Sequence, residues 1–436
     1  MTVGMIENYI ILFSNYIILF ISSAGVLYKS KQYYSLSKFF YLFSFFFFGI
    51  IPYLDYSTNN YYWGGTPIDD YYFIIANIII IISLICYFLG HLFSKKIQVN
   101  QINLEKEKIY LASMRKKIFK ISVLLLIICL IASYLILLKN DFNILLMAVR
   151  GMVDKSIHVQ RMSQIEFLVF NYFITPIPIS VLLIYGYISY GKKKRYQKLF
   201  LVSLFVLAFL FVAPTSIARF LAITLYLAII LRFTKLLERR YIFQIGTIFG
   251  LMIVMPFLDK FRYFDEKTFS FSIDFTFLSQ GSFDAYQNFI RLISIDYISY
   301  GNQLLGALFF YIPRSIWVDK PIGSGSVVAS LGNLQFDNIS MPLIGEGYIN
   351  FSIVGSLIFM MLLGMVSGTL DKYYWLLRSY TDNHWFFNIY YLLLGMSFFI
   401  LRGDLMSSFA YTVTLVGTYI ALVYFVHKVS ILKIGS

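Results

Sequence analysis

The sequence predicts an all-α protein that crosses a membrane many times and forms a single membrane-embedded domain over residues 1–436. Of these residues 59% are hydrophobic and 13% are charged, whereas a soluble protein carries about 25% charged residues. Apolar runs without any charge recur along the chain, for example over 74–89, 123–138 and 199–213. The core of a soluble protein does not need so many such runs, so we expect lipid to surround them.

About eleven segments, within a range of ten to twelve, approach the roughly 20 apolar residues that a helix needs to cross the hydrocarbon layer. The first segment has no basic leader before it and no small-residue cleavage site after it, which favours a retained helix over a signal peptide. A shorter apolar segment near 300–316 is expected to be a re-entrant or surface helix. The eleven predicted spans cover 8–28, 39–54, 73–93, 119–138, 167–190, 199–214, 218–235, 241–258, 349–370, 385–401 and 405–427.

The basic residues fall on alternate connections between these spans. Lys and Arg number 36 in the chain, and 24 of them lie in the connections 29–38, 94–120, 191–198, 232–241, 371–383 and 428–436, together with 5 of the 22 acidic residues. The rest of the chain holds 12 basic and 17 acidic residues, so the two sets carry +19 and −5, which sum to the net charge of +14. Because cytoplasmic loops collect Lys and Arg, we expect the N-terminus outside and the C-terminus in the cytoplasm. The same rule explains the net charge without a nucleic-acid partner.

Two longer loops face outward in this topology. The loop 259–348 is rich in Gly, Ser, Asp and aromatic residues, and we expect it to contain short helices and to cover an outward-facing groove. The loop 139–166 carries Arg150, Asp154, His158 and Arg161 at helical spacing, which places them in one stripe of a helix. Arg150, His158 and Arg161 are candidate substrate-binding residues, and His158 is the one histidine predicted to lie outside, where it would be available as a base. A solvated, salt-bridged helix face is the alternative interpretation.

The most distinctive sequence lies between residues 301 and 355. It contains Phe-Tyr-Ile-Pro-Arg-Ser-Ile-Trp over 310–317, Asp-Lys-Pro over 319–321, Gly-Ser-Gly-Ser over 323–326 and Ile-Gly-Glu-Gly-Tyr-Ile-Asn-Phe over 344–351. These blocks resemble the outer loop of the bacterial oligosaccharide repeat-unit polymerases, the Wzy-type O-antigen and capsule polymerase family. That family has a similar Pro-Arg-Ser-aromatic block, a Lys-Pro pair and a Gly-Glu-x-Tyr-x-Asn-Phe stretch.

Two further segments look like the same family pattern. One is Arg402-Gly403-Asp404 before the last span, and the other is Arg219 shortly after the Pro-Thr-Ser break at 214–216. The chain departs from the pattern at Val318, where many members have Pro, and at Ser352, where Gly is common.

The resemblance implies a metal-independent membrane glycosyltransferase of the bacterial inner (plasma) membrane, with a polyprenyl-pyrophosphate-linked donor. Such an enzyme transfers a growing glycan from undecaprenyl pyrophosphate onto the sugar end of an incoming lipid-linked repeat unit, in O-antigen, capsule or exopolysaccharide synthesis. Its partners would be the lipid-linked oligosaccharides, membrane lipids, a chain-length regulator and a flippase, and it needs no cofactor. The residues agree, because Cys86 and Cys129 lie in apolar runs and no Cys/His spacing matches a metal site.

The leaving group of this reaction is a pyrophosphate at the membrane surface, and arginine suits it because the guanidinium binds phosphate oxygens in pairs and keeps its charge. Arg314, Arg219 and Arg402 are the candidates, with Arg314 as a catalytic residue that stabilises the departing charge. Arg291 and Lys320 are outer-loop cations that would contact pyrophosphate or an acidic sugar. Alternatively, Arg314 is an interfacial anchor, Arg219 is the partner of a loop carboxylate, and Arg402 complements the dipole of its own helix.

The attacking sugar hydroxyl needs a base within hydrogen-bond reach. Glu346 and Asp404 are the candidate catalytic carboxylates, with Asp404 either the base or the group that holds Arg402. The alternative is structural, since both residues lie near predicted helix N-termini, which favour acids. Trp317 and Tyr348 are expected to line the saccharide path.

Two other functions stay open at this point. A lipid-linked oligosaccharide flippase would want charges along a cavity at mid-membrane depth, whereas these charges cluster at the predicted outer boundary. An O-antigen ligase, which transfers finished glycan to another acceptor, shares the architecture and the chemistry.

Overall fold

The computed structural model describes residues 3–28, 32–58, 68–96, 104–140, 142–143, 163–191, 194–261 and 281–431. Every regular element in this part of the chain is a helix, which confirms the predicted all-α fold. The longer helices are α1 (Val3–Leu27), α4 (Asp70–Ser94), α5 (Leu104–Lys116), α6 (Ile118–Lys139), α10 (Ile177–Ser189), α11 (Arg195–Phe211), α12 (Arg219–Phe233), α18 (Leu343–Tyr380), α19 (Trp385–Arg402) and α20 (Leu405–Ile431).

The remaining helices are shorter. They are α2 (Leu36–Ser44), which continues through a π-helical turn into α3 (Ile51–Thr58), and then α9 (Gln164–Leu168), α13 (Ile242–Phe249), α14 (Met255–Lys260), α15 (Ala285–Ile295), α16 (Asn302–Leu308) and α17 (Ser324–Leu331). The last three lie in the large loop 259–348, which was predicted to contain short helices. With seven residues, α16 is far too short to cross a membrane.

Eight helical segments in the described residues are long and apolar enough to span a membrane, so the chain is a polytopic membrane protein. They are Ile6–Leu27, Leu36–Thr58, Asp70–Ser94, Ile118–Lys139, Val169–Ser189, Leu343–Tyr380, Trp385–Arg402 and Leu405–Ile431. The other three predicted spans correspond to α11 with 17 residues, α12 with 15 and the segment Ile242–Leu258. The total of eleven spans therefore stays a prediction.

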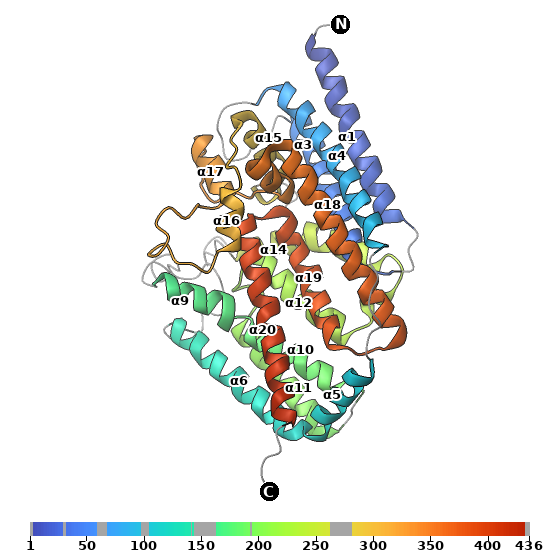
Figure 1. The fold of residues 1–436 in the computed structure, drawn as a ribbon, viewed down its shortest axis with the longest axis vertical. Helices are drawn as coiled ribbons and strands as arrows, with labels where there is room; N and C mark the ends of the chain where they lie inside the picture. The colour runs from blue at the N-terminus through green and yellow to red at the C-terminus, as the bar shows by residue number, and fades with distance from the viewer. Residues whose placement is uncertain are drawn as a thin grey trace.

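Four of the six basic connections lie together at one end of the bundle. Arg378 pairs with Glu238, and Ser113 contacts Ser430. Tyr187 links the two pairs, because its hydroxyl donates to Glu107 and its carbonyl accepts the side chain of Asn383, so four connections meet there. Figure 1 shows α15, α16 and α17 gathered away from this end, and the two termini at opposite ends of the molecule. Which end faces the cytoplasm stays the prediction of the charge pattern.

Small residues let the longest helix pack closely against α4. A Cβ on Gly364 of α18 would lie 2.1 Å from the carbonyl oxygen of Tyr87, and one on Gly90 would lie 2.0 Å from that of Met361. The hydroxyls of Tyr87 and Ser367 also bind each other at 2.8 Å. Close approach through glycine, reinforced by an interhelical hydrogen bond, is how helices associate in lipid, where burial against water supplies no driving force.

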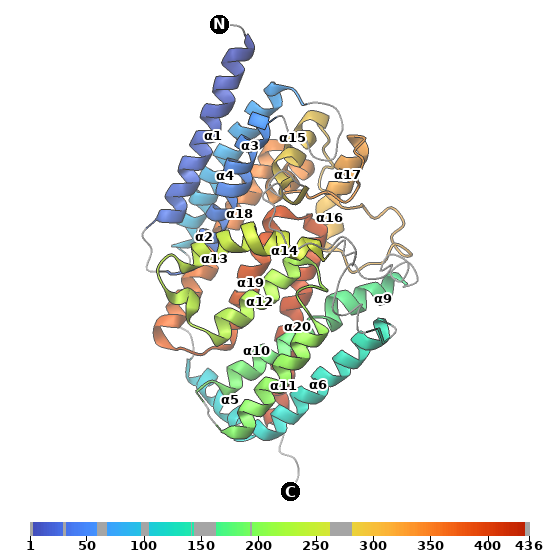
Figure 2. The ribbon, with the colours of Figure 1, turned by 180° about the vertical axis from the view of Figure 1, so that it is seen from behind.

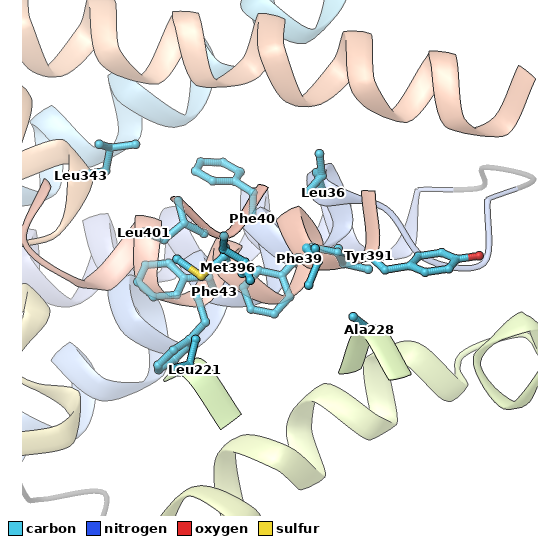
Figure 3. Packing of buried hydrophobic residues seen from close by; sticks show 14 of the residues in the cluster. Leu36, Phe39, Phe40, Phe43, Leu221, Ala228, Leu343, Tyr391, Met396 and Leu401 are labelled. Carbon is cyan, nitrogen blue, oxygen red and sulfur yellow. The ribbon is translucent and has the colours of Figure 1, made fainter. Parts of the chain in front are cut away.

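The apolar core fills the space between α2, α12, α18 and α19 (Figure 3). Phe40, Phe43 and Leu221 are buried there, and Phe40 stacks on Tyr87 of α4 at a centroid distance of 3.6 Å. Seen from behind, α12, α13 and α14 cross the middle of the molecule (Figure 2).

The predicted connection 371–383 begins within a helix and not in a loop. Because α18 runs on to Tyr380, Asp371 lies within the helix and is buried. Its carboxylate accepts the backbone N–H groups of Leu36 at 2.9 Å and Ser37 at 3.1 Å, and the hydroxyl of Tyr390 at 2.6 Å. It therefore satisfies the free N–H groups at the start of α2, a structural role for a buried charge.

Candidate functional site

Three motifs that are far apart in the sequence meet at Glu346. Its side chain is 1% exposed, and Oε1 accepts the backbone N–H of Leu405 at 2.9 Å while Oε2 accepts the hydroxyl of Ser324 at 2.8 Å. Leu405 begins α20 directly after Arg402-Gly403-Asp404, and Ser324 begins α17 in the Gly-Ser-Gly-Ser block. One buried carboxyl group thus joins the beginnings of α17, α18 and α20.

A sharp bend in α18 places Glu346 in this position. Phe351 and Ser352 have non-helical backbone angles, with φ 56° and ψ −153° at Ser352. The short arm 343–350 folds back on the long arm, so that Gly347 meets Gly355 and Ser356 donates to the carbonyl of Ile344 at 2.8 Å. A Cβ on Gly355 would lie 2.0 Å from the carbonyl oxygen of Gly347. The glycines of this motif therefore serve a close backbone crossing.

Asp404 lies beside this group and directly precedes α20. Its Oδ1 accepts the backbone N–H groups of Met406 at 3.0 Å and Ser407 at 3.3 Å, an N-cap arrangement. Its Oδ2 lies so close to Gly323 that a Cβ there would be 2.6 Å away. Burial raises the pKa of Asp404, and the backbone N–H groups of Ser407 and Gly325 oppose that rise. The capping role that the sequence allowed is present, and the carboxyl group is also part of the buried cluster.

Arg402 pairs with Asp284, and not with Asp404 as the sequence had suggested. Its Nη2 lies 2.9 Å from Asp284 Oδ1 and 3.0 Å from the carbonyl oxygen of Gly281. Asp284 also accepts the hydroxyl of Ser340 at 2.6 Å. The Nε of Arg402 is buried and has no hydrogen-bond partner in the described part of the chain, whereas the side chain as a whole is 21% exposed.

Arg314 and Lys320 hold together the loop that follows α16. Arg314 donates to the backbone carbonyls of Lys320 and, at 2.8 Å, of Pro321. Lys320 donates to the carbonyls of Phe310 at 2.7 Å and Ile312 at 2.9 Å. Burial lowers the pKa of Lys320, and the neighbouring Arg314 lowers it further. Both cations therefore have a local structural role, which the sequence did not indicate.

The structure gives the surroundings of three other candidates, and two of them differ from expectation. Arg291 was expected to be a cation of the outer loop, but it is 3% exposed within α15. Tyr348 is also buried, and its hydroxyl donates to Asp296 at 3.4 Å, so it does not line an open saccharide path. Arg219 is the first residue of α12, with Ala218 at the N-cap and no side-chain hydrogen bond that caps the helix.

Of the remaining candidates, the structure describes one, and three lie outside the described residues. Trp317 lies half-buried in the loop of Arg314. Arg150, His158 and Arg161 fall outside the described residues.

The three segments that carry Arg219, Arg314 and Arg402 border one aromatic cluster that the sequence analysis missed. Phe220 stacks on Phe399 at a centroid distance of 3.7 Å and meets Tyr411 edge-on at 5.1 Å. Tyr172 lies 4.4 Å from Tyr411 and 6.3 Å from Phe310. The cluster brings the three segments together, while Arg314 binds the carbonyls of its own loop and Arg402 binds Asp284.

Asp284, Ser324 and Ser340 are polar members of the site that sequence reasoning missed. Ser324 had a local signal, because it lies in the Gly-Ser-Gly-Ser block. Asp284 and Ser340 had none, since each is an ordinary loop residue until the fold brings it to Arg402 or to its partner.

The site thus combines two buried carboxyl groups with an arginine that has an unsatisfied donor. Two carboxyl groups in one buried place disfavour double ionisation, because like charges repel each other. Such a pair can accept or deliver a proton. Within the described residues, no group of three His, Cys, Asp or Glu side chains could hold a metal ion.

The fold and the site together define the class: a helical, polytopic membrane protein with a buried polar cluster where short loop helices meet the bundle. Comparison with protein-family models, curated proteins and solved structures finds no match.

Proposed function

We propose that the protein is a polysaccharide polymerase of the bacterial plasma membrane. It would transfer a growing glycan from undecaprenyl pyrophosphate to a hydroxyl on the sugar end of an incoming lipid-linked repeat unit. The bond from the anomeric carbon to the pyrophosphate breaks, the bond to the acceptor oxygen forms, and the acceptor proton passes to a carboxylate.

One observation carries this proposal: Glu346 joins the Gly-Glu motif, the Gly-Ser-Gly-Ser block and the turn of Asp404 in one buried cluster. The Gly-Glu motif and the turn of Asp404 are among the segments on which the resemblance to the polymerases rests. The carboxyl pair supplies the base that the acceptor hydroxyl needs. Arg402, held by Asp284 with its side chain 21% exposed, would offer its guanidinium charge to the pyrophosphate.

The test replaces Glu346 in cells that lack the chromosomal gene. Glu346→Gln keeps the shape of the side chain, an acceptor for Leu405 and a group that can bind Ser324, but it removes the proton-accepting carboxylate. We expect it to reach the membrane at the wild-type level and to leave single repeat units on the acceptor. Polymer length is read from the ladder of surface polysaccharide on a gel.

Glu238→Gln is the matched control, because it makes the same change at the opposite end of the bundle, in the ion pair with Arg378. It should keep the full ladder. A full ladder from Glu346→Gln would contradict the assignment of the base. The empty host separates the functions: one repeat unit per acceptor indicates a polymerase, whereas no displayed unit indicates a flippase or a ligase.

A further inference from the structure

The loop after α16 has an unusual distribution of side chains. Here the interfacial loop means residues 309–322, between α16 and α17, which project from the side of the bundle in Figure 1. Its two cations turn back to bind its own backbone carbonyls, through four hydrogen bonds in all. Its large apolar residues are instead exposed on the surface, with Ile316 76% exposed and Val318 77% exposed. A loop in water would be expected to show the opposite arrangement.

This exposed apolar surface is continuous with a face of the bundle that meets lipid. Phe351, Ile353 and Val354 are exposed at the outer part of α18. A Cβ on Gly301, at the start of α16, would lie 3.2 Å from the ring of Phe351. From there the exposed side chains of Leu305, Leu308 and Phe309 lead along α16 into the interfacial loop.

Local contacts fix α16 in this position. Asn350, in the short arm of α18, accepts the backbone N–H of Leu304 at 2.8 Å through its side-chain oxygen. Gly306 packs so closely on Pro321 and Met406 that a Cβ there would lie 2.4 Å from the Pro321 ring. The loop is therefore held beside the beginnings of α18 and α20.

We propose that the interfacial loop inserts into the lipid bilayer at the boundary between headgroups and acyl chains. Isolated apolar residues on a surface need no explanation, but a continuous patch rimmed by polar groups marks an interaction surface. Trp317 and the exposed Tyr311 belong to the residue types enriched at this boundary. The exposed Ser315 and Asp319 limit the depth to the headgroup region. The partner is thus the membrane itself, and the inference does not depend on the glycosyl transfer proposed above.

The experiment measures the depth of single spin labels in the full-length protein. Cysteine replaces Val318 in a chain whose two natural cysteines are removed by Cys86→Ala and Cys129→Ala, and the label is attached there. Two matched sites calibrate the measurement: Val366→Cys, on the exposed face of α18 in mid-span, and Asn338→Cys, in the exposed polar stretch before α18. The protein is reconstituted in vesicles of phosphatidylethanolamine and phosphatidylglycerol.

The readout is the collision rate of each label with oxygen, which dissolves in lipid, against that with a nickel chelate, which stays in water. We expect the ratio at Val318 to approach that at Val366 and to exceed that at Asn338. A ratio equal to that at Asn338 would place the loop in water and overturn the proposal. Protection from both reagents would also overturn it, because a second protein copy would then cover the loop.

Discussion

The close crossing of Gly347 and Gly355 gives the sharpest test of how the fold positions the site. Gly355→Ala would place a methyl group 2.0 Å from the carbonyl oxygen of Gly347. Ordinary contact begins near 3.4 Å, so the two arms of α18 must separate by about 1.4 Å, the difference of these distances. Overpacking of this kind costs about 1–3 kcal/mol.

The same displacement acts on the site, because Glu346 lies on the short arm. Its bonds to Ser324 and Leu405 measure 2.8 and 2.9 Å, and a shift of about 1.4 Å would stretch them beyond hydrogen-bond range. We therefore expect Gly355→Ala to lower the free energy of unfolding by about 1–3 kcal/mol and to shorten the polysaccharide ladder. Thermal unfolding in detergent and the gel assay measure the two effects.

Gly417→Ala is the matched control, because a Cβ at Gly417 in α20 meets nothing within 4 Å. Alanine is also the better helix former, so this variant should be as stable as the wild type or more stable. If Gly355→Ala retained both the wild-type stability and the full ladder, the crossing would not position Glu346, and the reasoning would be refuted.

Two further predictions concern the same region. Ser352→Gly should raise the free energy of unfolding by about 1 kcal/mol, because φ 56° with ψ −153° is a backbone region that glycine favours; a lower unfolding temperature in detergent would contradict this. Asp404→Asn should gain stability relative to the wild type as the pH rises from about 4 to about 7, measured by thermal unfolding at each pH. Burial raises the pKa of Asp404, so this carboxyl group favours the folded state at low pH and loses that contribution as the pH passes its raised pKa. If the stability difference between the two proteins did not change with pH, the raised pKa of Asp404 would be refuted.

The sequence indicated the residues of the site better than their roles. It singled out Glu346, Asp404 and the Gly-Ser-Gly-Ser block, and the structure brings these together. One of its alternatives had Asp404 hold Arg402, whereas the partner is Asp284, 118 positions away. Such a pairing leaves no local signal, because any loop carboxylate is equivalent until the chain is folded.

The sequence itself determined the membrane-spanning segments, because a helix in lipid must be apolar over a fixed length. The connections carry a second signal, because Lys and Arg collect in the loops on the cytoplasmic side. The tertiary structure alone decided the burial of Arg291, the placement of Asp371 within α18 and the bend at Ser352. These depend on which helix surfaces meet. Composition and periodicity record that a surface is apolar or small, but not which partner it contacts.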